Sequence, residues 1–137
     1  MAHDKFQVEV LTPEGEVFND EAEMLSTRTG IGSIGVLAHH APLLAMLDPT
    51  ELRIYKSESD VVSFAQAEGY LQVMNNHAIV LVEEAHSPDE LDAGELRDRL
   101  DRAERELESA EEDSEKKRVA ERDKRRLEQF LRIAESS

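Results

Sequence analysis

The chain of 137 residues contains no cysteine, and this absence removes a whole class of chemistry. There can be no disulfide, no thiolate nucleophile and no metal site built on cysteine sulfur. Long apolar runs are missing too, since no stretch approaches the roughly 20 apolar residues of a membrane-spanning helix. The first residues also lack the apolar core of a signal peptide. We therefore expect a protein that is soluble or peripherally attached to a membrane.

Positive charge is scarce, because 31 acidic residues stand against 16 lysines and arginines and give a formal net charge of −15. Phosphate groups would be repelled by such a chain, so neither nucleic acid nor a bare anionic membrane is expected as a primary partner. Only four of the bases lie in residues 1–87. From Pro88 onward the chain is dense in both signs, with 17 acids and 12 bases.

Proline and glycine divide the chain into two parts. All four prolines lie at or before Pro88, and Gly94 is the one glycine after it. Before this point, short runs of alternating apolar residues are separated by Gly, Pro and Asn, which is typical of a small β domain. After it, Glu, Asp, Arg, Lys, Ala and Leu predominate. We predict an α+β chain, with a β domain over residues 1–86 and a helical hairpin over residues 87–137.

In the first part we predict eight or more short antiparallel strands, as in a β-sandwich or a flattened barrel. Residues 6–11 alternate with period two, and 12–15 form a turn that contains Pro13. Asn75-Asn76 is typical of a hairpin turn between two further strands. The glycines between 30 and 35 indicate a tight bend or a bulge. The choice between sandwich and barrel stays open at this stage.

In the second part we expect a helix with Ser87 as its N-cap and Pro88 at its first position. Its apolar residues repeat at spacings of four and three, and residues 111–115 interrupt the pattern at the expected turn of the hairpin. The first apolar stripe comprises Leu96, Leu100, Ala103, Leu107 and Ala110, and the second comprises Val119, Ala120, Leu127, Phe130, Leu131 and Ala134. Because both stripes are thin, we expect the hairpin to be marginally stable alone and able to rearrange.

Catalytic and metal-binding patterns are not found. The side chains of His39 and His40 are adjacent in sequence and would point to opposite sides, so we expect no metal site. No Lys-Ser or Lys-Thr follows the glycines to make a phosphate loop, and Ser33 lacks the spacing of a nucleophile elbow. We expect no cofactor. A small carboxylate-dependent hydrolase would need paired acids in a concave site, and the sequence offers no candidate.

One basic cluster stands out in the tail, without the aromatic residues that stack on nucleic-acid bases. It can be a solvated helix face that pairs with Glu112, Glu115, Glu121 and Glu128, or a surface that meets an acidic partner. The cluster comprises Lys116, Lys117, Arg118, Arg122, Lys124, Arg125 and Arg126.

Three segments are similar to the epsilon subunit of bacterial and chloroplast F-type ATP synthases: residues 10–18, 32–44 and 68–73. The most specific is the run from Gly32 to Leu43, with its two glycines and its His-Ala-Pro-Leu sequence. The resemblance implies a ten-stranded β-sandwich followed by a helical hairpin, at the foot of the central stalk. It also implies a subunit that is no enzyme by itself and couples proton flow to rotation and ATP synthesis.

The resemblance further implies partners and sites. The β domain would bind the gamma subunit through His40, Ala41, Pro42 and Leu43, and touch the ring of c subunits through a loop of Gly32, Ser33, Ile34 and Gly35. The hairpin would inhibit ATP hydrolysis when it extends along gamma, with the basic cluster facing acidic surfaces of the alpha and beta subunits. Because no transit peptide is visible, we expect the cytoplasmic face of a bacterial cell membrane, with attachment only through the complex.

The chain departs from the family pattern at several positions. Ser33 stands where an acidic residue is common, and Ala38-His39 replaces the usual Pro-Gly. Some relatives bind ATP through Ile/Leu-Asp-x-x-Arg-Ala, and the matching residues here are Leu91, Asp92, Glu95 and Leu96. Because a glutamate replaces the arginine, we expect weak ATP binding or none. The alternative function is a β-sandwich adaptor whose helical arm is fixed and does not inhibit.

Overall fold

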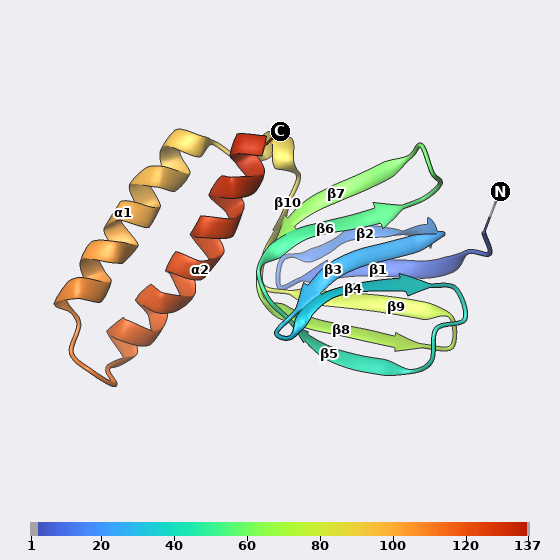
Figure 1. The fold of residues 1–137 in the computed structure, drawn as a ribbon, viewed down its shortest axis with the longest axis horizontal. Helices are drawn as coiled ribbons and strands as arrows, with labels where there is room; N and C mark the ends of the chain where they lie inside the picture. The colour runs from blue at the N-terminus through green and yellow to red at the C-terminus, as the bar shows by residue number, and fades with distance from the viewer. Residues whose placement is uncertain (1–2, 137) are drawn as a thin grey trace.

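The structure is a computed structural model that describes residues 3–136. Ten strands form one body, and two helices pack beside it (Figure 1). The strands are β1 (Phe6–Thr12), β2 (Gly15–Ala22), β3 (Met24–Thr29), β4 (Gly32–Leu37), β5 (Leu43–Leu47), β6 (Thr50–Tyr55), β7 (Val61–Gln66), β8 (Gly69–Met74), β9 (His77–Val82) and β10 (Ala85–His86). After them come a short 3-10 helix, η1 (Pro88–Glu90), and the helices α1 (Ala93–Ser109) and α2 (Glu115–Ser136). The predicted α+β fold class is confirmed.

The strand pairing decides between sandwich and barrel. The pairing order runs β10-β7-β6-β3-β5-β8-β9-β1-β2, and β4 pairs with β3. However, β3 meets β5 at a single residue pair, Thr29 and Leu47. The strands therefore form two five-stranded sheets that join at one corner, which makes the domain a sandwich. One pair departs from the antiparallel prediction, because β1 lies parallel to β9.

Alternating residues of both sheets meet in the core between them. Val8 and Val10 of β1 lie opposite Ala78 and Val80 of β9, and all four are buried. This agreement explains the parallel register, since a shift of one residue would turn these side chains outward. The predicted Asn75-Asn76 turn connects β8 to β9, and both residues have positive φ, 52° and 60°. Asparagine tolerates such values better than most residues.

Gly69 is a position where the fold requires glycine. A Cβ atom built there would lie 1.9 Å from the backbone oxygen of Leu81 and 2.7 Å from the Cα of Val82. Both obstacles belong to the backbone of the neighbouring strand, so they cannot move aside as a flexible side chain could. The absence of a side chain therefore lets β8 pair closely with β9.

The first long helix begins later than the sequence predicted. Ser87 makes no capping hydrogen bond through its side chain, and Pro88–Glu90 form only one 3-10 turn. The chain is extended at Leu91, and α1 starts after Asp92, whose carboxylate accepts a hydrogen bond of 3.1 Å from the backbone of Glu95. A helical turn therefore begins at Pro88 as predicted, but the prediction that the long helix starts there was wrong. The extended residue Leu91 packs against the cluster of apolar residues beneath the hairpin.

The hairpin packs on the β domain through α2, and α1 forms the outer layer (Figure 1). The predicted apolar stripes face each other and the end of β7. The buried residues of this contact are Ala65, Ala67, Leu96, Ala103, Leu127, Phe130 and Ile133. Among the described residues, no helix is long and apolar enough to cross a membrane.

Candidate functional site

An apolar surface lies on the outer side of the sheet formed by β5, β8 and β9. Its large exposed side chains are Leu44, Met46, Tyr70, Met74 and Leu81, which we call the apolar face. Met46 lies opposite Tyr70, and Tyr70 lies opposite Leu81, so the side chains form a continuous row across three strands. Leu44 is 71% exposed and Met46 is 68% exposed. A contiguous row of this kind is typical of a surface that a partner covers.

The predicted gamma-contact residues border this face. His40, Ala41 and Pro42 lie in the loop between β4 and β5, and Leu43 begins β5. The loop is held in place, since the backbone N–H of His39 donates a hydrogen bond of 2.7 Å to the side-chain oxygen of Asn76. The rings of the two histidines contact different groups: His39 lies 3.0 Å from Asp4, and His40 lies 2.6 Å from the carbonyl oxygen of Ala41.

The predicted c-ring segment has a different backbone from the one expected. Gly32, Ser33, Ile34 and Gly35 belong to strand β4 and pair with β3, so they do not form a loop. The turn lies just before them, at Gly30 and Ile31, and the side chain of Ile31 is fully exposed at the tip. Ile31 is not among the site residues predicted from the sequence. Its signal was the placement of a large apolar residue between two glycines.

The tip and the apolar face are connected. Residues 29–34 and 43–46 line one open, mainly apolar cavity of about 570 Å³. Leu43 of the predicted gamma-contact segment and Gly32, Ser33 and Ile34 of the predicted c-ring segment therefore line the same cavity. One partner, or two adjacent partners, could cover the whole surface.

The hairpin is held on the β domain by one buried cation. Arg126 of α2 is only 9% exposed, and its guanidinium donates hydrogen bonds to the carboxylates of Glu68 and Glu84 in the β domain. We call these three residues the arginine clamp. His86 supports the clamp, because its ring lies 2.9 Å from Glu84 and packs edge-on against Phe130 of α2.

The surroundings of the clamp favour the charged forms of Glu84 and Arg126. Burial by itself would raise the pKa of Glu84, but the hydrogen bond with His86 and the charge of Arg126 outweigh it and leave this pKa below its usual range. Burial would likewise lower the pKa of Arg126, yet the hydrogen bond and charge of Glu68 and the charge of Glu84 raise it. Glu84 and Arg126 therefore carry their charges at neutral pH.

Arg126 thus differs from the rest of the basic cluster in this conformation. Lys117 pairs with Glu112 at 2.7 Å, and Arg118 pairs with Glu115 at 2.9 Å, as on the solvated helix face considered from the sequence. Arg122 pairs with its neighbour Asp123 at 3.0 Å. The remaining members, Lys116, Lys124 and Arg125, make no ion pair among the described residues.

The segment that resembles an ATP-binding motif lines a small cavity of about 120 Å³. Leu91, Asp92, Glu95 and Leu96 lie there beside Arg99 and Phe130, at the start of α1. Two further carboxylates, Glu84 and Glu90, bring the acids around the cavity to four. Ligand pockets usually measure about 300–1,000 Å³, so both the size and the charge of this cavity oppose a nucleotide.

We therefore expect the full chain to show no saturable ATP binding below about 1 mM, a binding free energy near −4 kcal/mol. Isothermal titration calorimetry with MgATP measures this directly. A matched variant, Glu95→Arg, restores the arginine at the family position and should bind more tightly than the natural chain. Submillimolar binding by the natural chain would contradict the prediction.

The chain is similar in sequence to epsilon chains of ATP synthases. Residues 5–88 match the model of the β-sandwich domain of the ATP synthase delta/epsilon chain. The chain is 32% identical to the ATP synthase epsilon chain of a Sulfurihydrogenibium species, covering 94% of this chain and 96% of the relative. It is 34% identical to that of Rubrobacter xylanophilus, covering 91% and 88%. It is 38% identical to the chloroplastic epsilon chain of Adiantum capillus-veneris, covering 74% and 76%.

Solved structures share the fold at lower identity. A chain of the Euglena gracilis mitochondrial ATP synthase has a TM-score of 0.77 at 19% identity, with 99% of this chain and 84% of that chain covered. A chain of the central stalk and c-ring of the Tetrahymena thermophila mitochondrial ATP synthase has a TM-score of 0.61 at 18% identity, covering 98% and 99%.

Proposed function

Because the chain belongs to the epsilon-chain family of ATP synthase subunits, we propose that it works in the central stalk of a proton-translocating F-type enzyme. There it would couple rotation of the c ring and gamma to ATP synthesis, as a subunit that is not catalytic by itself. The complex would hold it at the cytoplasmic face of a bacterial cell membrane.

The proposal rests on the separation of two surfaces of the β domain, one that holds the hairpin and one that is open to a partner. The hairpin packs against β6 and β7, whereas the apolar face lies on β5, β8 and β9. A partner can therefore cover the apolar face without displacing the hairpin. A subunit that must stay attached to a stalk while its arm changes position needs this separation.

We assign the apolar face, with His40, Ala41, Pro42 and Leu43 at its border, to the gamma subunit. The segment Gly32, Ser33, Ile34 and Gly35 would approach the c ring, with Ile31 at the tip as its main apolar contact. Support comes from the exposure of Ile31 and of the apolar face, which together leave a large apolar area in water. Burying such an area stabilises a complex by roughly 25 cal/mol per Å² before the costs of association.

We further propose that residues 87–137 act as a conformational inhibitor of ATP hydrolysis. Few apolar side chains and one arginine clamp hold the hairpin down, so the docked state is separable from the stability of the sandwich. The hinge would lie at η1, between the domain of residues 1–86 and the arm. When extended, the arm would turn Lys116, Lys117, Arg118, Arg122, Lys124, Arg125 and Arg126 toward acidic surfaces of the alpha and beta subunits.

Removal of the arm tests the proposal. We expect a chain that ends at Ser87 to bind the cognate alpha-beta-gamma complex and to raise its ATP hydrolysis rate relative to the full chain. If both forms bind and hydrolysis is the same, the arm is a fixed docking element, which is the alternative function. If neither form binds, the central-stalk assignment is wrong. Steady-state hydrolysis with each form at saturation measures the difference.

A further inference from the structure

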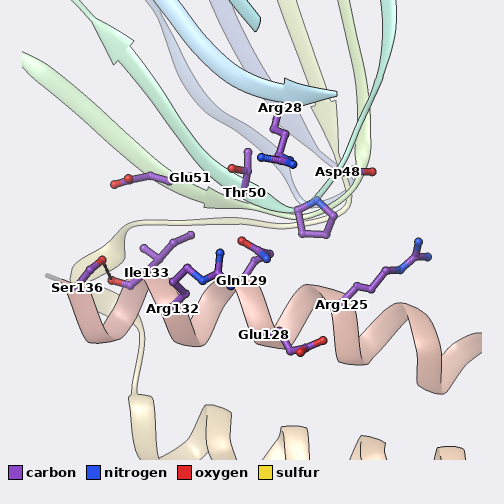
Figure 2. Close-up of a pocket in the computed structure, with 11 residues that line it drawn as sticks. Arg28, Asp48, Thr50, Glu51, Arg125, Glu128, Gln129, Arg132, Ile133 and Ser136 are labelled. Carbon is purple, nitrogen blue, oxygen red and sulfur yellow. Dashed lines mark hydrogen bonds between the residues drawn. The ribbon is translucent and has the colours of Figure 1, made fainter. Parts of the chain in front are cut away.

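Three arginines with no ion pair among the described residues line one cavity between the hairpin and the β domain: Arg28, Arg125 and Arg132 (Figure 2). The chain has nearly twice as many acids as bases, 31 against 16. Other exposed arginines, such as Arg99, Arg102 and Arg105, also make no ion pair among the described residues. The three arginines of this cavity differ from them in their position, because they come from two separate segments and line one cavity. Guanidinium groups gathered in this way indicate a site for an anion from outside the protein.

Both walls of the cavity contribute. Arg28 comes from the end of β3, where its backbone oxygen accepts a hydrogen bond of 3.1 Å from the N–H of Asp48 and so joins the strand to the turn before β6. The opposite wall is α2, which carries Arg125, Gln129 and Arg132. The buried side chain of Ile133 holds this part of α2 against the β domain. The cavity measures about 480 Å³, within the usual range of ligand sites.

The side chains are arranged to receive negative charge. In Figure 2, Arg28, Gln129 and Arg132 point into the gap between α2 and the strands, with Thr50 beside them and Arg125 at one end. The acids that also border the cavity turn away from its centre: Asp48 and Glu51 extend outward along the strands, and Glu128 lies on the far side of the helix (Figure 2). Glu51 is also engaged elsewhere, at 2.8 Å from Arg53.

We propose that this cavity binds a multivalent inorganic oxyanion of the phosphate class. The guanidinium groups of Arg28 and Arg132 would hold the anion from the two walls, and the amide of Gln129 and the hydroxyl of Thr50 would donate further hydrogen bonds. This cavity shares no lining residue with the acidic cavity at Glu95. The two sites are therefore separate, and the acids that oppose phosphate there do not act here.

An anion bound in this place joins the β domain to α2 and so favours the docked hairpin. It binds the docked state and loses half of its ligands when the arm leaves, which is the differential affinity that a population shift requires. An effect of the bound anion on ATP hydrolysis rests on the proposed function, whereas the binding of the anion is independent of that function.

Titration of the ¹⁵N-labelled full chain with sodium phosphate, at constant ionic strength maintained with sodium chloride, tests the site. We expect saturable shifts of arginine side-chain NMR signals with a dissociation constant above about 1 mM, since the arginines are solvent-exposed. In the double variant Arg28→Gln/Arg132→Gln the affinity should fall roughly tenfold or more. The matched control Arg102→Gln removes an exposed arginine of α1 that lines neither cavity, and should bind like the natural chain.

The possible outcomes either support or overturn the oxyanion site. Competition between sulfate and phosphate would support an oxyanion site. If a nucleotide binds more tightly than phosphate and its binding is lost in the double variant, the same site is supported, with a nucleotide as the source of the phosphate group. No saturable response to phosphate, an equal response to chloride, or an undiminished response of the double variant would overturn the proposal. Because all three arginines are exposed, their replacement leaves the core intact, and circular dichroism checks this.

Discussion

Replacing Arg126 by alanine should release the hairpin from the β domain while the sandwich stays folded. The substitution removes the one cation between Glu68 and Glu84 and leaves two carboxylates close together beneath α2. Breaking a fully buried pair costs about 3–5 kcal/mol. Since the two glutamates are about 30% exposed, water offsets part of this loss, and we expect about 2 kcal/mol. The ratio of docked to released hairpin should fall roughly 30-fold.

Hydrogen exchange of the α2 amides measures this release, because a hairpin of low intrinsic stability loses protection once it leaves its support. Arg102→Ala is the matched control, since it removes an arginine from the exposed side of α1. In the assembled complex, Arg126→Ala should also lower ATP hydrolysis if the released arm inhibits. Unchanged exchange in α2 would show that the apolar contacts alone hold the hairpin.

Acid should weaken the clamp in the same way. The pKa of Glu84 is lowered in the folded protein, so its contribution is complete above the unfolded pKa of about 4.3 and is lost as the pH falls through the lower folded value. Protection of α2 should therefore decline in this acidic range in the natural chain. In Arg126→Ala the decline should be smaller, since the hydrogen bond with His86 still lowers the pKa of Glu84 but the contribution of Arg126 is gone.

Replacing Met46 by glutamate should abolish attachment to the gamma-containing complex. Met46 lies beside Tyr70 on the apolar face, at the β5 end of the row, and a carboxylate there would be buried without a partner when gamma binds. A penalty of about 3 kcal/mol or more is expected, equivalent to at least a roughly 100-fold loss of affinity. Biolayer interferometry with immobilised alpha-beta-gamma complex gives the dissociation constants.

A matched substitution separates this effect from a general effect of charge. Val61→Glu also places a carboxylate at an exposed apolar position, but on β7 of the other sheet. We expect this variant to bind like the natural chain. Equal losses for the two variants, or no loss for Met46→Glu, would place the gamma contact away from the apolar face.

Local patterns in the sequence predicted much of the fold correctly. The alternation of apolar residues indicated the strands, the Asn75-Asn76 pair indicated its hairpin, and the seam beginning at Leu96 indicated the face that α1 buries. These features depend on residues close in sequence, whose side chains share a face for geometrical reasons. The helix start was predicted at the wrong residue, because Ser87 and Asp92 can both cap a helix and only packing at Leu91 distinguishes them.

Arg126 shows where sequence reasoning ends. It stands in a run of basic residues and looks the same as Arg125 in the sequence. In the structure Arg126 is buried between two glutamates, whereas Arg125 lines an open cavity. The same applies to Arg28 and Arg132, which lie 104 positions apart in the chain and line one cavity. Periodicity places a residue on a helix face, but it does not say what that face meets.

The amino-acid sequence alone determined that this chain has a β part and a helical part, that the helical arm is weakly apolar, and that its motifs are those of an epsilon chain. Only the tertiary structure decided where the arm rests, which arginine holds it, and which sheet face stays open for a partner. The physical reason is range: propensity and hydrophobic period act within a few residues, whereas burial and ion pairing depend on groups that the fold brings together from distant segments.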